Sequence, residues 1–290
     1  MSAVKPKDDV TRFRDLAVPP GHLALWWLGQ AGFLIKTPGG VTTALDPYLS
    51  NSCKAIGEAA GFDMDRMVPP PLEPAGLAGI DLYCVTHSHQ DHLDPETIGP
   101  FLAVDDGAKF VAPAESAEKL ASVGVPRERI EVTWPNRTVT VGDLSLRAAF
   151  AIPLGGDDLT HVGYFCFVDG GPRVYFTGDT AYHDVLVAAM APHRPDVLVA
   201  VINGAFRNMG PANAATLAAR LGVKVVIPCH HDLFRDNMQP PQMLRTNLRL
   251  LEMDHAYRPL KHGELFMFPE AATSATLSSG RKGQDAGETA

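Results

Sequence analysis

Short apolar runs, separated by turn-forming residues, dominate this chain and are typical of β-strands. LALWWLG and GFLIKT come first, and VTTALDP follows across the turn Pro38-Gly39-Gly40. IDLYCVT is short and almost entirely apolar, as expected for a buried central strand. Further strands are predicted at KFVAP, TVTVGDLSLRAAF, VGYFCFV, RVYFTGD, DVLVAVIN, VKVVIPC and ELFMFP.

Helical patterns lie between these strands. The segment from Pro211 to Leu221 starts with proline and is followed by Gly222, which is a common combination at the two ends of a helix. Because strands outnumber helices and helices occur throughout, we expect packed β-sheets with helices outside. The other predicted helices run from Pro95 to Ala103, Glu115 to Val123, His183 to Met190 and Pro240 to Asp254.

The body of the chain, residues 21–270, contains no linker-like stretch and is predicted to form one domain. Residues 1–20 are charged and end in Pro19-Pro20, which predicts an irregular arm. Residues 271–290 are small and polar, which predicts a disordered tail. With 290 residues, 46% of them hydrophobic, the chain can form a large core.

The net charge and the apolar pattern of the sequence limit the classes of binding partner that we expect. The formal net charge is −8 and Lys and Arg are scattered, so we expect no nucleic-acid partner. No apolar run is long enough to span a membrane, and the first residues lack the apolar segment of a secretory signal, so a cytoplasmic protein is expected. A small-molecule substrate and a homo-oligomer are both compatible with the sequence. Widely spaced cysteines, three of them in apolar strand-like runs, indicate reduced, buried thiols: Cys53, Cys84, Cys166 and Cys229.

The stretch VTHSHQDHLD concentrates three of the 11 histidines in ten residues directly after a predicted strand. In extended backbone His87 and His89 point the same way and can bind one ion together. Asp94 is a plausible helix N-cap, so Asp91 and His92 lie in the turn before the helix and can bind a second ion. Imidazole and carboxylate suit zinc, manganese or iron. The alternative is a polar loop that contains histidines by chance.

Two more candidates lie at the open end of a predicted hairpin. HVGYFCFVDGGPRVYFTGD has its tip near Gly170 and Gly171, so facing residue numbers should sum to 340 or 341. His161 and Asp179 would then be cross-strand neighbours. The aspartate could bridge two ions and the histidine could complete one of them. A turn aspartate and a register slip of one residue are the respective alternatives.

The run VKVVIPCHHD ends another buried strand in two adjacent histidines. Neighbouring residues of an extended chain point in opposite directions, so one histidine is expected to be a ligand, and we favour His230. His231 is then a supporting group, a substrate contact, a proton donor or a surface residue. Asp46, at another strand end, is expected to orient a ligand histidine by accepting its second N–H, with a turn role before Pro47 as the alternative.

The motifs THSHQDH, TGDT and IPCHH, in this order, resemble those of the metallo-β-lactamase-fold hydrolases. WWLGQAGFLIK, LDPYLSNS, RMVPPP, GDTAYH and GVKVVIPCHHDLF are similar to the branch of this family that contains L-ascorbate-6-phosphate lactonase. The resemblance covers about residues 22–268. It implies an α/β fold, an αββα sandwich of two mixed β-sheets with helices on the outer faces and a metal site along one edge.

The resemblance also implies two divalent metal ions, zinc or manganese. One ion would be bound by His87, His89 and Asp179, and the other by Asp91, His92, Asp179 and His230. The family's usual further histidine stands farther before the bridging aspartate than His161 does, so the role of His161 is left open.

From these ligands we expect a metal-bound hydroxide that attacks an ester-like carbonyl. Asp91 could accept the proton of the water, and His231 or His183 could protonate the leaving alkoxide. Arginines in the neighbouring loops would suit a phosphate or carboxylate on the substrate, although ordinary loop roles are equally compatible. The candidate substrate contacts are Tyr48, Asn51, Arg66, Asn203 and Arg207.

The function that we expect first is a lactonase-type hydrolase of a small cyclic ester, phosphorylated or carboxylated. A phosphodiesterase is the alternative, because two metal ions also suit in-line attack at phosphorus. A di-iron redox or oxygen-binding protein on the same fold is the third hypothesis. It would usually carry a glutamate ligand and a flavin domain, and the sequence shows neither.

Overall fold

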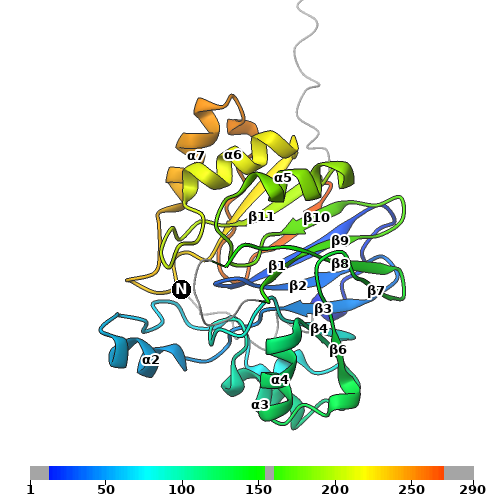
Figure 1. The fold of residues 1–290 in the computed structure, drawn as a ribbon. Helices are drawn as coiled ribbons and strands as arrows, with labels where there is room; N and C mark the ends of the chain where they lie inside the picture. Colours follow the sequence, from blue (N-terminus) through cyan, green and yellow to red (C-terminus); the bar gives the residue numbers. More distant parts are fainter. Residues whose placement is uncertain (1–12, 154–159, 271–290) are drawn as a thin grey trace, which may run out of the picture.

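The computed structural model describes residues 13–153 and 160–270, whose strands form two mixed β-sheets (Figure 1). The first sheet has the order β13-β1-β2-β3-β4-β5-β6 and the second has the order β12-β11-β10-β9-β8-β7. Each sheet combines parallel and antiparallel pairs. The strands are β1 (Leu23–Gly29), β2 (Gly32–Lys36), β3 (Thr42–Leu45), β4 (Leu82–Cys84), β5 (Lys109–Ala112), β6 (Ile130–Val132), β7 (Thr138–Val141), β8 (Leu144–Phe150), β9 (Val162–Phe167), β10 (Arg173–Phe176), β11 (Val197–Val201), β12 (Val225–Cys229) and β13 (Leu265–Phe268).

Strand β1 shows why its sequence is apolar at every position. Alternate side chains point to opposite faces of a sheet. Leu25 and Trp27 belong to the core between the two sheets, whereas Trp26 and Leu28 pack with Phe101 on the outer face of the first sheet. A strand that is covered on both faces has no solvent-facing side, and therefore reads as a continuous apolar run.

Helices cover the outer face of each sheet, which confirms the predicted αββα sandwich (Figure 1). Helices α3 (Pro95–Leu102) and α4 (Ala114–Ser122) cover the first sheet. Helices α5 (Asp184–Met190), α6 (Pro211–Leu221) and α7 (Pro241–Leu250) cover the second. The remaining helical elements are α2 (Cys53–Ala60) and the 3₁₀ helices η1 (Pro74–Leu77), η2 (Arg127–Arg129), η3 (Ala191–His193) and η4 (Asp254–Ala256).

Three elements differ from the sequence-based expectation. Helix α2 was not predicted, because Gly57 interrupts its pattern and Ser52 provides no side-chain cap. Strand β6 has three residues, too few for a clear alternation. The helix expected from Pro240 to Asp254 ends at Leu250, since Glu252 has a left-handed φ of 60° that a helix cannot continue through.

The cysteines match the expectation of buried thiols: all four are free and buried, three of them in strands. In the parts of the chain that the structure describes, no helix has both the length and the apolar character needed to cross a membrane.

The two sheets are joined by hydrogen bonds along one edge, where several strands end. The amide of Val162, at the start of β9, donates to the carbonyl of Thr86, which follows β4 (3.0 Å). The amide of His230, after β12, donates to the carbonyl of Gln30 between β1 and β2 (2.8 Å). Loops of both sheets therefore meet along this edge.

Candidate metal centre

The loop after β4 contributes the first group of side chains. His87 and His92 are fully buried, and His87 Nε2 lies 2.9 Å from His89 Nδ1. The loop ends where Asp94 caps α3 by accepting a hydrogen bond from the amide of Glu96 (3.0 Å), as predicted. The turn that contains Asp91 and His92 is closed by the amides of His92 and Leu93, which donate to the carbonyl of His89 (3.1 and 2.8 Å).

The hairpin β9–β10 contributes the second group, and its register is the predicted one. Phe167 pairs with Arg173 and Tyr164 pairs with Phe176, so facing residue numbers sum to 340. Continued past the ends of the strands, this register places His161 beside Asp179, and His161 Nδ1 lies 3.4 Å from the Asp179 carbonyl oxygen. Both residues are buried.

The third contribution comes after β12 and distinguishes two adjacent histidines. His230 Nε2 lies 3.2 Å from a carboxylate oxygen of Asp91 and 3.4 Å from one of Asp179. His230 has a left-handed φ of 59°, which turns the chain sharply after the strand. His231 points elsewhere: its ring packs on Trp27, with centroids 4.8 Å apart.

Five imidazoles and two carboxylates thus form three overlapping clusters, in each of which the donor atoms lie within 4.8 Å of one another. This donor set is typical of zinc and also suits manganese. His92 Nε2 and Asp179 Oδ1 are both buried and lie 3.4 Å apart. Neither atom has a hydrogen-bond partner among the described residues, so both are available to bind a cation. The clusters are His87-His89-His161, Asp91-His92-His230 and His87-His92-Asp179.

The charge states of these groups also favour a cation. Burial works against the charge of Asp179, but His230 and His92 hold its pKa well below the ordinary value. Burial likewise would lower the pKa of His92, yet the carboxylates of Asp179, Asp91 and Asp46 outweigh burial and raise that pKa well above the ordinary value. The Asp179 carboxylate is therefore ionised beside protonated imidazoles, and a divalent cation bound here would take the place of those protons.

Asp46 lies behind the cluster, in the place expected for a residue that orients a ligand. Its carboxylate is 2.8 Å from His92 Nδ1 and accepts hydrogen bonds from the amide and the hydroxyl of Thr86 (2.8 and 2.6 Å). With Nδ1 engaged in this way, His92 directs Nε2 toward Asp91 and Asp179.

Further side chains contact the cluster and were not singled out from the sequence, among them Thr86, whose hydroxyl lies 3.0 Å from His87 Nδ1. The fully buried amide of Gln30 donates to Asp91 (2.8 Å) and lies 3.1 Å from both ring nitrogens of His230. The amide of Asn208 donates to Asp179 (2.6 Å). A polar residue within the apolar run WWLGQAGFLIK was the only signal for Gln30.

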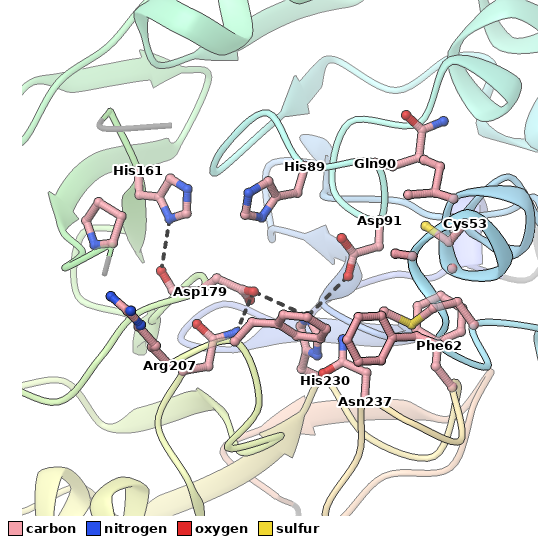
Figure 2. Close-up of a pocket in the computed structure, with 18 residues that line it drawn as sticks. Cys53, Phe62, His89, Gln90, Asp91, His161, Asp179, Arg207, His230 and Asn237 are labelled. Atoms are coloured by element: carbon pink, nitrogen blue, oxygen red, sulfur yellow. Dashed lines mark hydrogen bonds and ion pairs between the residues drawn. The ribbon is translucent and has the colours of Figure 1, made fainter. Parts of the chain in front are cut away.

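A cavity of about 570 Å³ opens beside the cluster, within the usual size range of small-molecule sites. Figure 2 shows five of the seven candidate ligands facing this space, with Phe62 and Cys53 on the opposite side from His161 and Arg207. Asp91 therefore has access both to the other candidate ligands and to a molecule in the cavity. The candidate ligands that line the cavity are His89, Asp91, His161, Asp179 and His230.

Of the predicted substrate contacts, only Arg207 lines the cavity. The guanidinium of Arg66 donates to the carbonyls of Tyr48 and Ser50 (2.8 and 3.1 Å) and stacks on the Tyr48 ring. Asn51 donates to Asp65 (2.8 Å). These groups hold their own loop together and do not face the cavity.

The other predicted polar residues also lie outside the cavity lining. Asn203 is buried and donates to Asn237 (2.6 Å), a residue that does line the cavity. His183 is exposed and caps α5 by accepting a hydrogen bond from the amide of Val185 (3.1 Å). The structure therefore does not bring the two proposed proton donors, His183 and His231, to the cavity.

Comparison with known proteins identifies the class that this fold and site define. The family described as "Beta-lactamase superfamily domain" matches residues 24–230, and the chain therefore belongs to the metallo-β-lactamase superfamily. With the clusters described above, this membership indicates a site for divalent metal ions.

Individual relatives agree with this family. The chain is 28% identical over 267 residues to a protein named "Probable L-ascorbate-6-phosphate lactonase UlaG" from Salmonella heidelberg, an alignment that covers 79% of this chain and 75% of the relative. Among solved structures, the metallo hydrolase Igni18 from Ignicoccus hospitalis matches with a TM-score of 0.67 at 20% identity, covering 86% of this chain and all of Igni18. A possible metal-dependent hydrolase from Veillonella parvula matches with a TM-score of 0.70 at 18% identity, covering 84% and 98%.

Proposed function

We propose that this protein is a metal-dependent hydrolase of esters, with a cyclic ester as its most suitable substrate. The convergence of histidines and aspartates from both sheets beside a cavity carries this proposal. The lactonase names of its relatives support the choice of a cyclic ester. We propose two divalent ions, zinc or manganese, as the cofactors.

In this proposal His87, His89 and His161 hold one ion, and Asp91, His92 and His230 hold the other. Asp179 clusters with His87 of the first group and His92 of the second, and lies 3.4 Å from His92 and His230, so its carboxylate would be available to either ion. Bound divalent ions acidify water and withdraw charge from a carbonyl oxygen, which are the two requirements for ester hydrolysis at neutral pH.

The residues of the chain position the reactants and move the proton. Asp91 lines the cavity and is the group best placed to accept a proton from the attacking water and to pass it to the leaving alkoxide. Gln30 holds the Asp91 carboxylate in position with its 2.8 Å hydrogen bond. Asn208 does the same for Asp179.

Metal analysis followed by substrate panels tests the proposal. The purified protein should contain about two equivalents of zinc or manganese. With that metal restored, it should hydrolyse lactones, with L-ascorbate 6-phosphate as one member of the panel, faster than phosphodiesters. A preference for phosphodiesters, or iron as the bound metal, would contradict the proposed reaction.

Variants then link the reaction to the cluster. His89→Ala and Asp179→Ala should lower kcat/KM by at least about 1,000-fold, since each removes a group that holds or bridges the ions, while the circular dichroism spectrum is retained. His161→Ala should lose about one ion per chain. His183→Ala is the matched control, because this exposed histidine caps α5 outside the cavity and should leave the rate unchanged. Normal turnover in both His89→Ala and Asp179→Ala would refute the assignment.

A further inference from the structure

Helix α2 forms an apolar wall of the cavity. Four residues of α2 line the cavity: Cys53, Ile56, Gly57 and Ala60. The last three follow Cys53 by three, four and seven positions, which places all four on one face of the helix. Lys54 and Glu58 of the same helix are exposed and do not line the cavity. The helix thus turns its apolar face toward the site, in addition to the contacts that it makes with Met64.

Two aromatic rings extend this wall from different parts of the chain. Phe62 follows α2 and Phe206 lies in the loop after β11, and their rings meet edge to face with centroids 5.5 Å apart. Phe62 is 41% exposed, Phe206 54% and Ile56 53%, although all three are large apolar residues that line the cavity. Their exposed surface is therefore available to a molecule bound there.

The charged groups in the cavity are concentrated at the metal centre, and its other polar side chains, which include Gln90 on the side of Cys53, are uncharged. Among the described residues that line it, Arg207 is the only charged side chain outside the candidate ligands. In Figure 2 Arg207 lies on the side of His161, away from Phe62 and Cys53. The cavity therefore has a polar, metal-binding end and an apolar end, which suits a substrate with one reactive polar group and one hydrocarbon part.

We propose that the substrate is a hydrophobic ester or lactone, whose alkyl or aromatic part lies on Ile56, Phe62 and Phe206 while its carbonyl faces the metal centre. The proposal rests on the proposed hydrolase function and narrows its substrate class. It is an alternative to the expectation of a phosphorylated or carboxylated substrate, which came from the arginines of the loops, of which Arg207 lines the cavity. Ile56, Phe62 and Phe206 are then specificity-determining residues.

Binding and hydrolysis of one homologous series test this inference separately. Isothermal titration calorimetry on the metal-loaded protein measures the Kd of γ-lactams with side chains from hydrogen to hexyl, which are unreactive analogues of γ-lactones. Full burial strengthens binding about fourfold per methylene, so at least about twofold per methylene is expected in this partly open cavity. The matching γ-lactones should show a similar rise in kcat/KM and should exceed the phosphorylated sugar lactone of the panel above.

Substitutions identify the surface responsible for the effect. Ile56→Asn and Phe62→Ala should reduce the gain in affinity per methylene to less than about 1.5-fold, because each removes apolar surface that the alkyl chain of the lactam would cover. Both residues are substantially exposed, so the fold should survive both changes. Leu250→Ala is the matched control, since this leucine is 77% exposed on α7 and does not line the cavity.

Each result has a distinct meaning. A Kd that does not change with chain length, or tighter binding of the phosphorylated lactone than of the hexyl lactam, would overturn the proposed substrate class. An equal loss of the gain in Leu250→Ala would overturn the assignment to the α2 wall. If lactams bind with the expected dependence on chain length but no lactone is hydrolysed, the apolar binding site stands and the proposed reaction fails.

Discussion

Asp46 and Gln30 show how the metal centre extends beyond its histidine motif. Both residues follow a strand of the first sheet, and both have a left-handed φ, 44° for Asp46 and 51° for Gln30. Residues other than glycine adopt this conformation at a cost, which functional sites commonly retain. The backbone turn directs Asp46 to His92 and Gln30 to Asp91 and His230.

We predict that Gln30→Leu weakens metal binding by about 10- to 100-fold, the usual effect of removing a group that orients metal ligands. Leucine keeps much of the volume but cannot donate to Asp91. Competition with a chelator of known affinity measures the change. Gln242→Leu on the exposed face of α7 is the control, and an affinity in Gln30→Leu equal to that of this control would show that the amide does not support the ligands.

Helix α2 contains a glycine that interrupts the helical pattern in the sequence and is nevertheless required by the packing of the fold. Gly57 lies in the middle of this helix, where glycine is unfavourable by about 1 kcal/mol relative to alanine. A Cβ at this position would lie 2.6 Å from Met64 Cβ and 2.8 Å from the carbonyl of Phe62. The glycine therefore lets the segment 62–64 pack against the helix and complete the apolar wall.

Gly57→Ala is accordingly expected to lower the free energy of unfolding by about 1–3 kcal/mol, because overpacking outweighs the gain in helix propensity. Gly107→Ala is the control: this exposed glycine has no left-handed φ and nothing lies within 4 Å of a Cβ there, so alanine should stabilise by up to about 1 kcal/mol. Urea denaturation measures both values. A stabilising Gly57→Ala would mean that the segment 62–64 does not need this close approach.

The assembled molecule places its candidate ligands on both sheets. His87, His89, Asp91 and His92 follow β4 of the first sheet, whereas His161, Asp179 and His230 adjoin strands of the second. An ion at this site therefore links the two halves of the sandwich, as the hydrogen bonds from Val162 and His230 already do. The native fold brings these groups together and the unfolded chain does not, so metal binding should stabilise the native state.

Metal removal should therefore lower Tm. An ion at 100 times its Kd contributes about 2.7 kcal/mol, which corresponds to about 5–10 °C for a protein of this size. Differential scanning calorimetry before and after chelation, with the metal then restored, measures the effect. Asp179→Asn should show a much smaller metal-dependent shift. A Tm that is insensitive to metal in the wild-type protein would argue against ligands contributed by both sheets.

Local patterns sufficed for most strands and for the histidine loop. The continuous apolar run of β1, the register of the β9–β10 hairpin and the cap at Asp94 all depend on neighbouring or nearly neighbouring residues. Spacing within one loop likewise grouped His87 with His89 and Asp91 with His92, and the structure brings the same pairs together. Such features are visible in a sequence because short-range geometry dictates them.

Contacts between residues far apart in the sequence determined the other features of the site. The choice between His230 and His231 depends on one backbone turn and on Trp27, and Gln30 reaches His230 across 200 residues. The cavity wall joins α2 to Phe206, segments that no periodicity relates. Arginines in two loops predicted an anionic substrate, yet Arg66 is used by its own loop and only Arg207 lines the cavity. A side chain's role at a site depends on which surface it faces, and that is set only when distant segments pack.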